Sequence, residues 1–138
     1  MHTFKTRATK LTGTDYKEVY KKSFSFYKSI KSRTKRRPYV RSAYFNKEKI
    51  FLELFWYHVR SKTNHRDKLR RLKYFRCAIE LIEKSKDKPI SGKKPFKKSE
   101  HFYRFAGITQ EGDLFYVQIK EDKGTGNKWL MSVFPVSK

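Results

Sequence analysis

The stretch HFYRFAGITQEGDLFYVQIKED, residues 101 to 122, most constrains the fold, because apolar and polar residues alternate on both sides of a turn. Its Glu111-Gly112 pair predicts a β-hairpin with a two-residue connection, in which Gln110 faces Asp113. This register sets every cross-strand pair of the hairpin. It also decides which side chains share a face, because neighbouring residues of a strand point to opposite faces of the sheet.

In this register one face of the hairpin is mostly apolar, and we expect helices to cover it. That face holds Phe102, Arg104, Ala106, Ile108, Phe115, Val117, Ile119 and Glu121. The opposite face is aromatic and basic, and we expect it to stay open. It holds His101, Tyr103, Phe105, Gly107, Tyr116, Gln118 and Lys120. Arg104 would therefore reach the open face only from the sheet edge or by bending round it.

A third strand is predicted over residues 128 to 136, KWLMSVFPV, after a loop that contains Gly124 and Gly126. We expect Ser132 to lie beside Gln118 and Leu130 beside Lys120, with Met131 and Val133 in the core. A shift by one residue would reverse these faces. The first register is favoured because it keeps the small polar side chain of Ser132 out of the core.

Apolar residues at helical spacing predict most of the upstream elements. A helix is expected over residues 15 to 30 behind an Asp15 cap, and a short strand over residues 39 to 45. Two helices follow, over residues 47 to 61 and 64 to about 85, capped by Asn46 and Asn64 and packed as an antiparallel hairpin. The second has a core stripe of Leu69, Leu72, Phe75, Ile79 and Ile82. Residues 1 to 14 are expected to be a mobile or partner-ordered tail, and residues 84 to 100 a Lys-rich loop.

These elements predict an α+β fold: a short strand, a two-helix hairpin and a three-stranded antiparallel meander. A chain of 138 residues suits one modest core. We expect residues 39 to 138 to form this domain. Residues 1 to 38 would be a basic N-terminal extension, made of the tail and the helix over residues 15 to 30.

The charge of the chain favours nucleic acid as its partner. Lys and Arg number 35 against 13 Asp and Glu, a net charge of +22 that attracts polyanions. Aromatic residues make up 17% of the chain and can stack on unpaired bases, which favours RNA. The residues predicted to bind nucleic acid are Arg36, Arg37, Arg41, Arg66, Arg70, Lys73, Lys94, Lys97, Tyr103, Tyr116 and Gln118. The basic helix face is equally consistent with an ordinary solvated surface.

Several other classes of protein fit poorly. No run of eighteen apolar residues is present and the first residues lack the apolar core of a secretory signal, so we expect a cytoplasmic protein with no membrane span. The single Cys77 cannot form an internal disulfide and is predicted to be a buried structural thiol. The four His residues are too scattered for a ligand set, so no metal and no cofactor are expected. His58 is interpreted as a core histidine.

The open face of the predicted sheet carries groups suited to RNA cleavage without a metal. Such cleavage needs a base for the 2′-hydroxyl, positive charge on the phosphorane and an acid for the leaving oxygen. The catalytic candidates are His101, Arg104, Lys120 and Ser132, with Tyr103 and Tyr116 beside them.

The order of elements, with the strands HFYRF, VQIK and SVFP, resembles the RelE-like ribonuclease toxins, and in detail their phage and mobile-element branch. That group also includes barnase, EndoU and colicin-type nucleases, and the resemblance covers residues 39 to 136. It implies a metal-independent endoribonuclease with its site on the concave sheet face, often acting on ribosome-held RNA. By position, the site would use His101, Arg104, Lys120 and Ser132.

Two other functions stay open at this stage. One is a non-catalytic RNA- or DNA-binding module, for which the basic arm and helix are enough. The other is an accessory protein of a mobile element, whose charge is met by an acidic partner such as an antitoxin.

Overall fold

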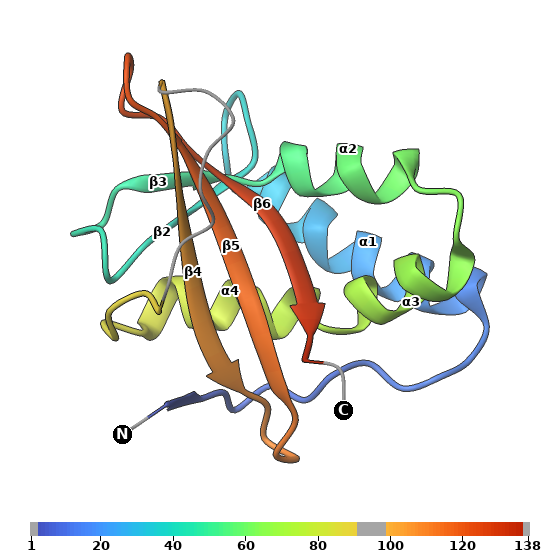
Figure 1. Ribbon diagram of the computed structural model, residues 1–138. Coiled ribbons are helices and arrows are strands. Elements are labelled where there is room, and N and C mark those ends of the chain that lie inside the picture. The colour runs from blue at the N-terminus through green and yellow to red at the C-terminus, as the bar shows by residue number, and fades with distance from the viewer. Residues whose placement is uncertain (1–2, 91–98, 137–138) are drawn as a thin grey trace.

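The computed structural model describes residues 3 to 90 and 99 to 136. A six-stranded mixed sheet of order β1-β4-β5-β6-β3-β2 packs against helices (Figure 1). The strands are β1 (Phe4–Lys5), β2 (Tyr39–Arg41), β3 (Lys49–Phe51), β4 (Glu100–Ile108), β5 (Leu114–Asp122) and β6 (Lys128–Pro135). The helices are α1 (Tyr16–Ser32), α2 (Glu53–Ser61), α3 (His65–Lys73) and α4 (Phe75–Lys84).

The α+β class is confirmed, but the sheet is larger than the predicted meander. Strands β4, β5 and β6 form the antiparallel centre, and β1 joins β4 and β3 joins β6 in parallel. Strand β2 completes the sheet by pairing with β3 in antiparallel fashion. Three short segments from the first half of the chain therefore extend the sheet on both sides (Figure 1).

Strands β4 and β5 form the predicted hairpin, but the predicted register is wrong by one residue. Thr109 faces Asp113, and its N–H donates to the Asp113 carbonyl at 2.9 Å, so three residues make the loop. A two-residue type I′ turn needs positive φ at both central positions. Gly112 has a φ of 97°, whereas Glu111 has no positive φ. The hairpin therefore uses the longer loop, with glycine in its left-handed position.

The corrected register moves every side chain of β4 to the opposite face, while β5 keeps its predicted orientation. Phe105 packs in the core beside Val117, although it was expected on the open face. Arg104 faces Gln118 on the side turned away from the helices, although it was expected in the core. His101 lies on the helix side, in line with Phe105.

The third strand follows the predicted register for half of its length. Ser132 pairs with Gln118 as predicted, and Val133 is buried. A β-bulge then inserts Met131 into β6, so Lys120 pairs with Trp129 instead of Leu130. Leu130 consequently lies in the core, and Met131 is half-buried outside the core cluster.

The first turn of the helix predicted over residues 47 to 61 is a strand instead, because it pairs with two other strands of the sheet. Residues 49 to 51 form β3, in which Ile50 is fully buried between β2 and β6. Asn46 is not a helix cap, because it has a φ of 59° and belongs to a tight turn. The predicted strand over residues 39 to 45 is correspondingly shorter and ends at Arg41.

The second predicted helix is divided at Tyr74 into α3 and α4. At this break the Leu11 N–H donates to the Lys73 carbonyl at 3.0 Å, which satisfies an acceptor that the interruption leaves free. The Asn64 cap is confirmed, since its side chain accepts a hydrogen bond from the Asp67 N–H. The core stripe is also confirmed, with Leu72, Phe75, Ile79 and Ile82 buried.

The N-terminal residues are built into the sheet instead of forming a free tail. Strand β1 pairs with β4, and the backbone N–H groups of Arg7 and Ala8 donate to the Glu80 carboxylate at 2.7 and 2.9 Å. Helix α1 has its predicted Asp15 cap and buries Val19 and Ile30 in the same core as α4 and the sheet. The N-terminal extension and the later elements thus share one core.

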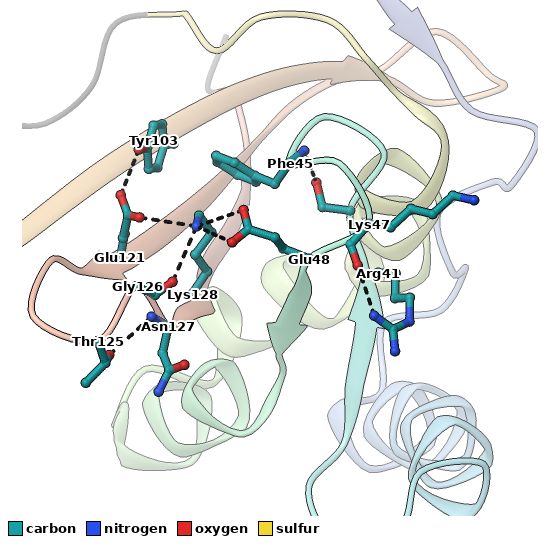
Figure 2. Close-up of polar contacts among 11 residues, drawn as sticks. Arg41, Phe45, Lys47, Glu48, Tyr103, Glu121, Thr125, Gly126, Asn127 and Lys128 are labelled. Atoms are coloured by element: carbon teal, nitrogen blue, oxygen red, sulfur yellow. Dashed lines mark hydrogen bonds and ion pairs between the residues drawn. The ribbon is translucent and has the colours of Figure 1, made fainter.

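A buried lysine ties the β5–β6 hairpin to the turn between β2 and β3. Figure 2 shows the Lys128 amine between the carboxylates of Glu48 and Glu121, at 3.0 and 3.2 Å. The amine also donates to the Gly126 carbonyl at 3.3 Å, and the Tyr103 hydroxyl donates to Glu121 at 2.8 Å. The Lys128 side chain is 6% exposed, so its charge depends on these partners.

We predict that Lys128→Met lowers the free energy of unfolding by about 1–3 kcal/mol, because Glu121 loses a charge-assisted hydrogen bond in a largely buried place. Urea unfolding monitored by circular dichroism measures the change. The matched control is Lys123→Met, which makes the same substitution at an exposed position of the same hairpin. Equal stability of the two variants would contradict the prediction.

Candidate functional site

A cleft of about 640 Å³ lies beside β6, where the strand faces the ends of α2 and α3. Strand β3 pairs with β6 only at Lys128 and Trp129, so the later part of β6 has no strand on that side. The polar lining of the cleft comes from separate elements: His58, Ser61, Lys62, Arg71, Arg104, Gln118 and Ser132. Its apolar lining is Phe55, Val59, Met131 and Phe134.

Arg104, Gln118 and Ser132 form one row across β4, β5 and β6, on the sheet face opposite the core residues Phe105 and Val117. Arg104 donates from Nη2 to Gln118 Oε1 at 3.4 Å. Its guanidinium lies 5.4 Å from the ring centre of Phe134, which favours a cation by its quadrupole. Within the described residues the buried Arg104 Nε has no hydrogen-bond partner.

A second guanidinium reaches the same row from α3. Arg71 donates from Nη1 to the Ser132 hydroxyl at 2.5 Å and from Nε to Asp67 at 3.0 Å. Its guanidinium centre is 5.6 Å from the Phe134 ring, which Arg104 also approaches. Two guanidiniums therefore approach one aromatic ring from different elements. An anion between them would receive donors from both, as phosphate does in arginine sites.

His58 contributes an imidazole to the cleft. Its Nδ1 lies 3.3 Å from the Met131 carbonyl oxygen, which can only accept a hydrogen bond. This contact assigns the proton to Nδ1 and leaves Nε2 as the proton acceptor of the neutral ring. Met131 is the extra residue of the β-bulge, and such a residue is not paired in the ladder, so its carbonyl is available to His58.

The charges around the cleft are predominantly positive. Lys62, Arg71 and Arg104 line it, and Asp67 accepts contacts from Lys62 at 3.4 Å and from Arg71. Burial acts to raise the pKa of Asp67, but the hydrogen bond from Arg71 and the nearby Lys62 outweigh it and hold this pKa below its usual value. One carboxylate thus stays ionised and orients two cations, and the cleft keeps a positive excess.

The structure brings together two of the four predicted catalytic residues. Arg104 and Ser132 line the cleft with Gln118 between them. His101 lies on the opposite face, where its ring is 4.5 Å from that of Tyr103, so its expected place beside Gln118 is wrong. Lys120 shares the face of Gln118, but it lies outside the cleft and pairs with Glu100 at 2.6 Å.

The two tyrosines expected together on the open face lie on opposite faces of the sheet. Tyr116 lies on the face of the cleft, with the Arg104 guanidinium 5.5 Å from its ring centre. Tyr103 lies on the helix side, and its expected position on the open face is wrong. Burial and the hydrogen bond to Glu121 raise the pKa of Tyr103 to about 12, so the hydroxyl stays protonated.

Most of the predicted basic residues lie outside the cleft. Arg36 and Arg37 line a separate groove of about 620 Å³, with Arg33, Lys35, Tyr39, Lys49 and Phe51. Arg41 donates to the Lys47 carbonyl at 3.0 Å (Figure 2). Arg66 and Arg70 are exposed on α3, and Lys73 is half-buried at its end. Lys94 and Lys97 lie outside the described residues.

Sequence reasoning missed His58, Lys62 and Arg71 as members of the cleft. His58 falls on an apolar helical face, which is typical of a core histidine, and Arg71 falls beside a solvated basic face. Their common feature is proximity to β6, which depends on how α2 and α3 pack against that strand. A local pattern carries no signal for such long-range contacts.

Over residues 3 to 90 and 99 to 136, no group of three or more His, Cys, Asp or Glu side chains could hold a metal ion. No helix among these residues is long and apolar enough to cross a membrane. Comparison with protein-family models, curated proteins and solved structures finds no match.

Cys77 is buried, as predicted, and we expect its thiol to be unreactive in the folded protein. Burial raises its pKa to about 11, so at pH 8 roughly one thiol in a thousand is ionised, against about a quarter for a free thiol. Ellman's reagent at pH 8 should therefore label Cys77 quickly in denaturant and negligibly without it. Rapid labelling of the folded chain would contradict this.

The geometry of the cleft also predicts that it binds phosphate. We expect inorganic phosphate at about ten times its dissociation constant to raise the melting temperature by a few degrees, because it binds the folded state alone. Arg104→Gln should lose most of this rise. Lys123→Gln, which removes an equal charge from an exposed position, should keep it. An equal rise in both variants would show that phosphate binds elsewhere.

Proposed function

We propose that the protein binds RNA and cleaves its backbone in the cleft without a metal ion. The observation that carries this proposal is the approach of Arg71 and Arg104 to one ring, beside the imidazole of His58. The net charge of +22 supports a polyanionic substrate. Positive charge and a positioned base are two of the three requirements of metal-independent RNA cleavage, and the third is an acid for the leaving oxygen.

In the proposed reaction the scissile phosphate lies between the guanidiniums of Arg71 and Arg104. His58 Nε2 takes the proton of the 2′-hydroxyl, and the 2′-oxygen attacks phosphorus. The bond from phosphorus to the 5′-oxygen breaks, and this oxygen receives a proton from Lys62 or from water. The products are a 2′,3′-cyclic phosphate and a 5′-hydroxyl. The Arg104 guanidinium, which lines the cleft, would donate to the phosphorane oxygens as their charge increases.

The other polar residues of the row have a supporting role in this proposal. Ser132 and Gln118 hold the two guanidiniums by hydrogen bonds at 2.5 and 3.4 Å. The rings of Tyr116 and Phe134 lie 5.6 Å apart between centroids on the same face. They offer surfaces on which unpaired bases next to the scissile phosphate can stack.

We also propose that the order of elements from β3 to β6 is that of the RelE-like ribonuclease toxins. A strand, a helical pair with α3 and α4 as its second member, and an antiparallel meander support this proposal. Under this proposal the RNA is held by the ribosome, and an acidic antitoxin balances the positive charge. The cytoplasm of the host cell would then be the place of action.

A non-catalytic RNA-binding module is the second candidate, and the groove near Arg36 favours it. That groove is lined by five basic residues and two aromatic residues, with no acidic residue. Such a surface binds phosphates and bases whether or not the cleft cleaves RNA. The two candidates differ in the fate of the bound RNA.

RNA cleavage assays distinguish the ribonuclease from the non-catalytic binding module. We predict that the purified protein cleaves RNA in the presence of EDTA and leaves 2′,3′-cyclic phosphate ends. His58→Ala should lower the rate about 10²–10⁴-fold, because the general base is lost. Gel analysis of end-labelled RNA measures the rate, and phosphatase resistance identifies the cyclic ends.

His101→Ala is the matched control, because it removes the imidazole on the other face of the sheet. We expect it to cleave at the wild-type rate. Loss of activity in His101→Ala with retention in His58→Ala would reverse the assignment of the base. Intact RNA with every variant, together with salt-sensitive binding, would establish the binding module instead.

A further inference from the structure

A pocket of about 440 Å³ adjoins the cleft on the side of α2, and we name it the aromatic pocket. Its walls are Leu54, Tyr57 and Trp129, and its remaining lining is Arg37, Glu53 and Lys120. Tyr57 is 69% exposed, whereas the other aromatic residues of the same helix, Phe55 and Trp56, are buried. Exposed rings with basic neighbours need a partner that is both flat and anionic.

The aromatic pocket and the cleft are lined by neighbouring residues of α2. Tyr57 and His58 are neighbours on α2, and their ring centroids are 6.0 Å apart. Lys120 lies two residues along β5 from Gln118 on the same face, a step of about 7 Å. A ligand that extends by one nucleotide from the cleft along β5 therefore enters the aromatic pocket.

A row of paired residues leads away from the aromatic pocket across the sheet. Lys120 pairs with Trp129, Trp129 with Phe51, and Phe51 with Tyr39. Three strand spacings of about 4.8 Å separate the ends of this row, which thus spans about 14 Å. Its far end is the basic groove of Arg33, Lys35, Arg36 and Lys49, which shares Arg37 with the aromatic pocket.

The aromatic surface of the pocket favours a nucleic acid over an acidic protein. Arg37 pairs with Glu53 and lies 4.1 Å from the ring centre of Phe51, so the one acidic residue of the lining is already neutralised. Lys120 pairs with Glu100, which leaves aromatic surface as the main feature of the pocket. Stacking on rings with phosphates at a basic rim is how proteins bind single-stranded nucleic acid.

We propose that the aromatic pocket stacks one unpaired base of a single-stranded RNA, next to the phosphate in the cleft, and that the basic groove holds the following phosphates. This inference rests on the proposed function. It restricts the substrate to single-stranded RNA, because the bases of a duplex are stacked on each other and cannot reach Tyr57 and Trp129.

Binding measured by fluorescence anisotropy tests the inference. The probe is a labelled 2′-O-methyl RNA of about ten nucleotides, within the usual site sizes, which lacks the attacking hydroxyl and stays intact. We expect Tyr57→Ala to weaken binding about 5- to 150-fold, the loss of one stacked base. Tyr57→Phe, which keeps the ring, should bind like the wild type. The same oligomer as a duplex should bind both variants equally.

Intrinsic fluorescence gives an independent readout. The chain has two tryptophans, of which Trp56 is 2% exposed and Trp129 lines the pocket. Stacking of a base should quench the emission of Trp129, and Trp129→Phe should abolish the quenching. Circular dichroism melts verify that Tyr57→Ala, at an exposed position, keeps the wild-type fold.

The outcomes distinguish this inference from the proposed function. The inference would be overturned if Tyr57→Ala bound the single-stranded RNA as tightly as the wild type does. It would also be overturned if Tyr57→Ala lost equal affinity for the single strand and for the duplex. RNA cleavage by the wild type would still stand in either case. Failure of the wild-type protein to bind either RNA would overturn both. Selective loss on the single strand with quenching of Trp129 supports the aromatic pocket, whether or not His58 proves to be the base.

Discussion

The register between β4 and β5 is the constraint on which the candidate site depends. A loop of three residues, with Gly112 in the left-handed region, sets this register. A loop shorter by one residue would turn every side chain of β4 to the other face. Arg104 would then enter the core, and His101 would join Gln118 on the open face. The backbone geometry of one hairpin thus selects which cations and which imidazole surround the cleft.

The β-bulge in β6 also decides which side chains reach the candidate site. Without the extra Met131, Trp129 and Ser132 would point to opposite faces, because residues three apart on a regular strand do so. The bulge places both on the face away from the helices, so the cleft and the aromatic pocket adjoin. It also leaves the Met131 carbonyl available to His58. Bulges are common near functional sites because they redirect side chains in this way.

The buried Lys128 and the two arginines of the cleft, Arg71 and Arg104, differ in how completely their charges are paired. Lys128 is buried between two carboxylates, so its charge serves the packing of the β5–β6 hairpin. Arg71 and Arg104 are held by neutral groups and one carboxylate, and the Arg104 Nε lacks an acceptor within the described residues. A cation with incomplete pairing in a partly buried place is costly without a ligand and favourable with an anionic one.

The sequence by itself determined the α+β class, the hairpin and its third strand, the Asp15 and Asn64 caps, the core stripe of α3 and α4, and the positive charge. These features follow from local periodicity, capping chemistry and composition. Tertiary structure decided the loop length of the hairpin, β1 and β3, the break at Tyr74, and the meeting of His58, Arg71 and Arg104. The loop length depends on the backbone conformation of the turn, and each of the others depends on hydrogen bonds or contacts between residues far apart in the chain. Local periodicity does not encode such contacts, which form only when helices and strands pack together.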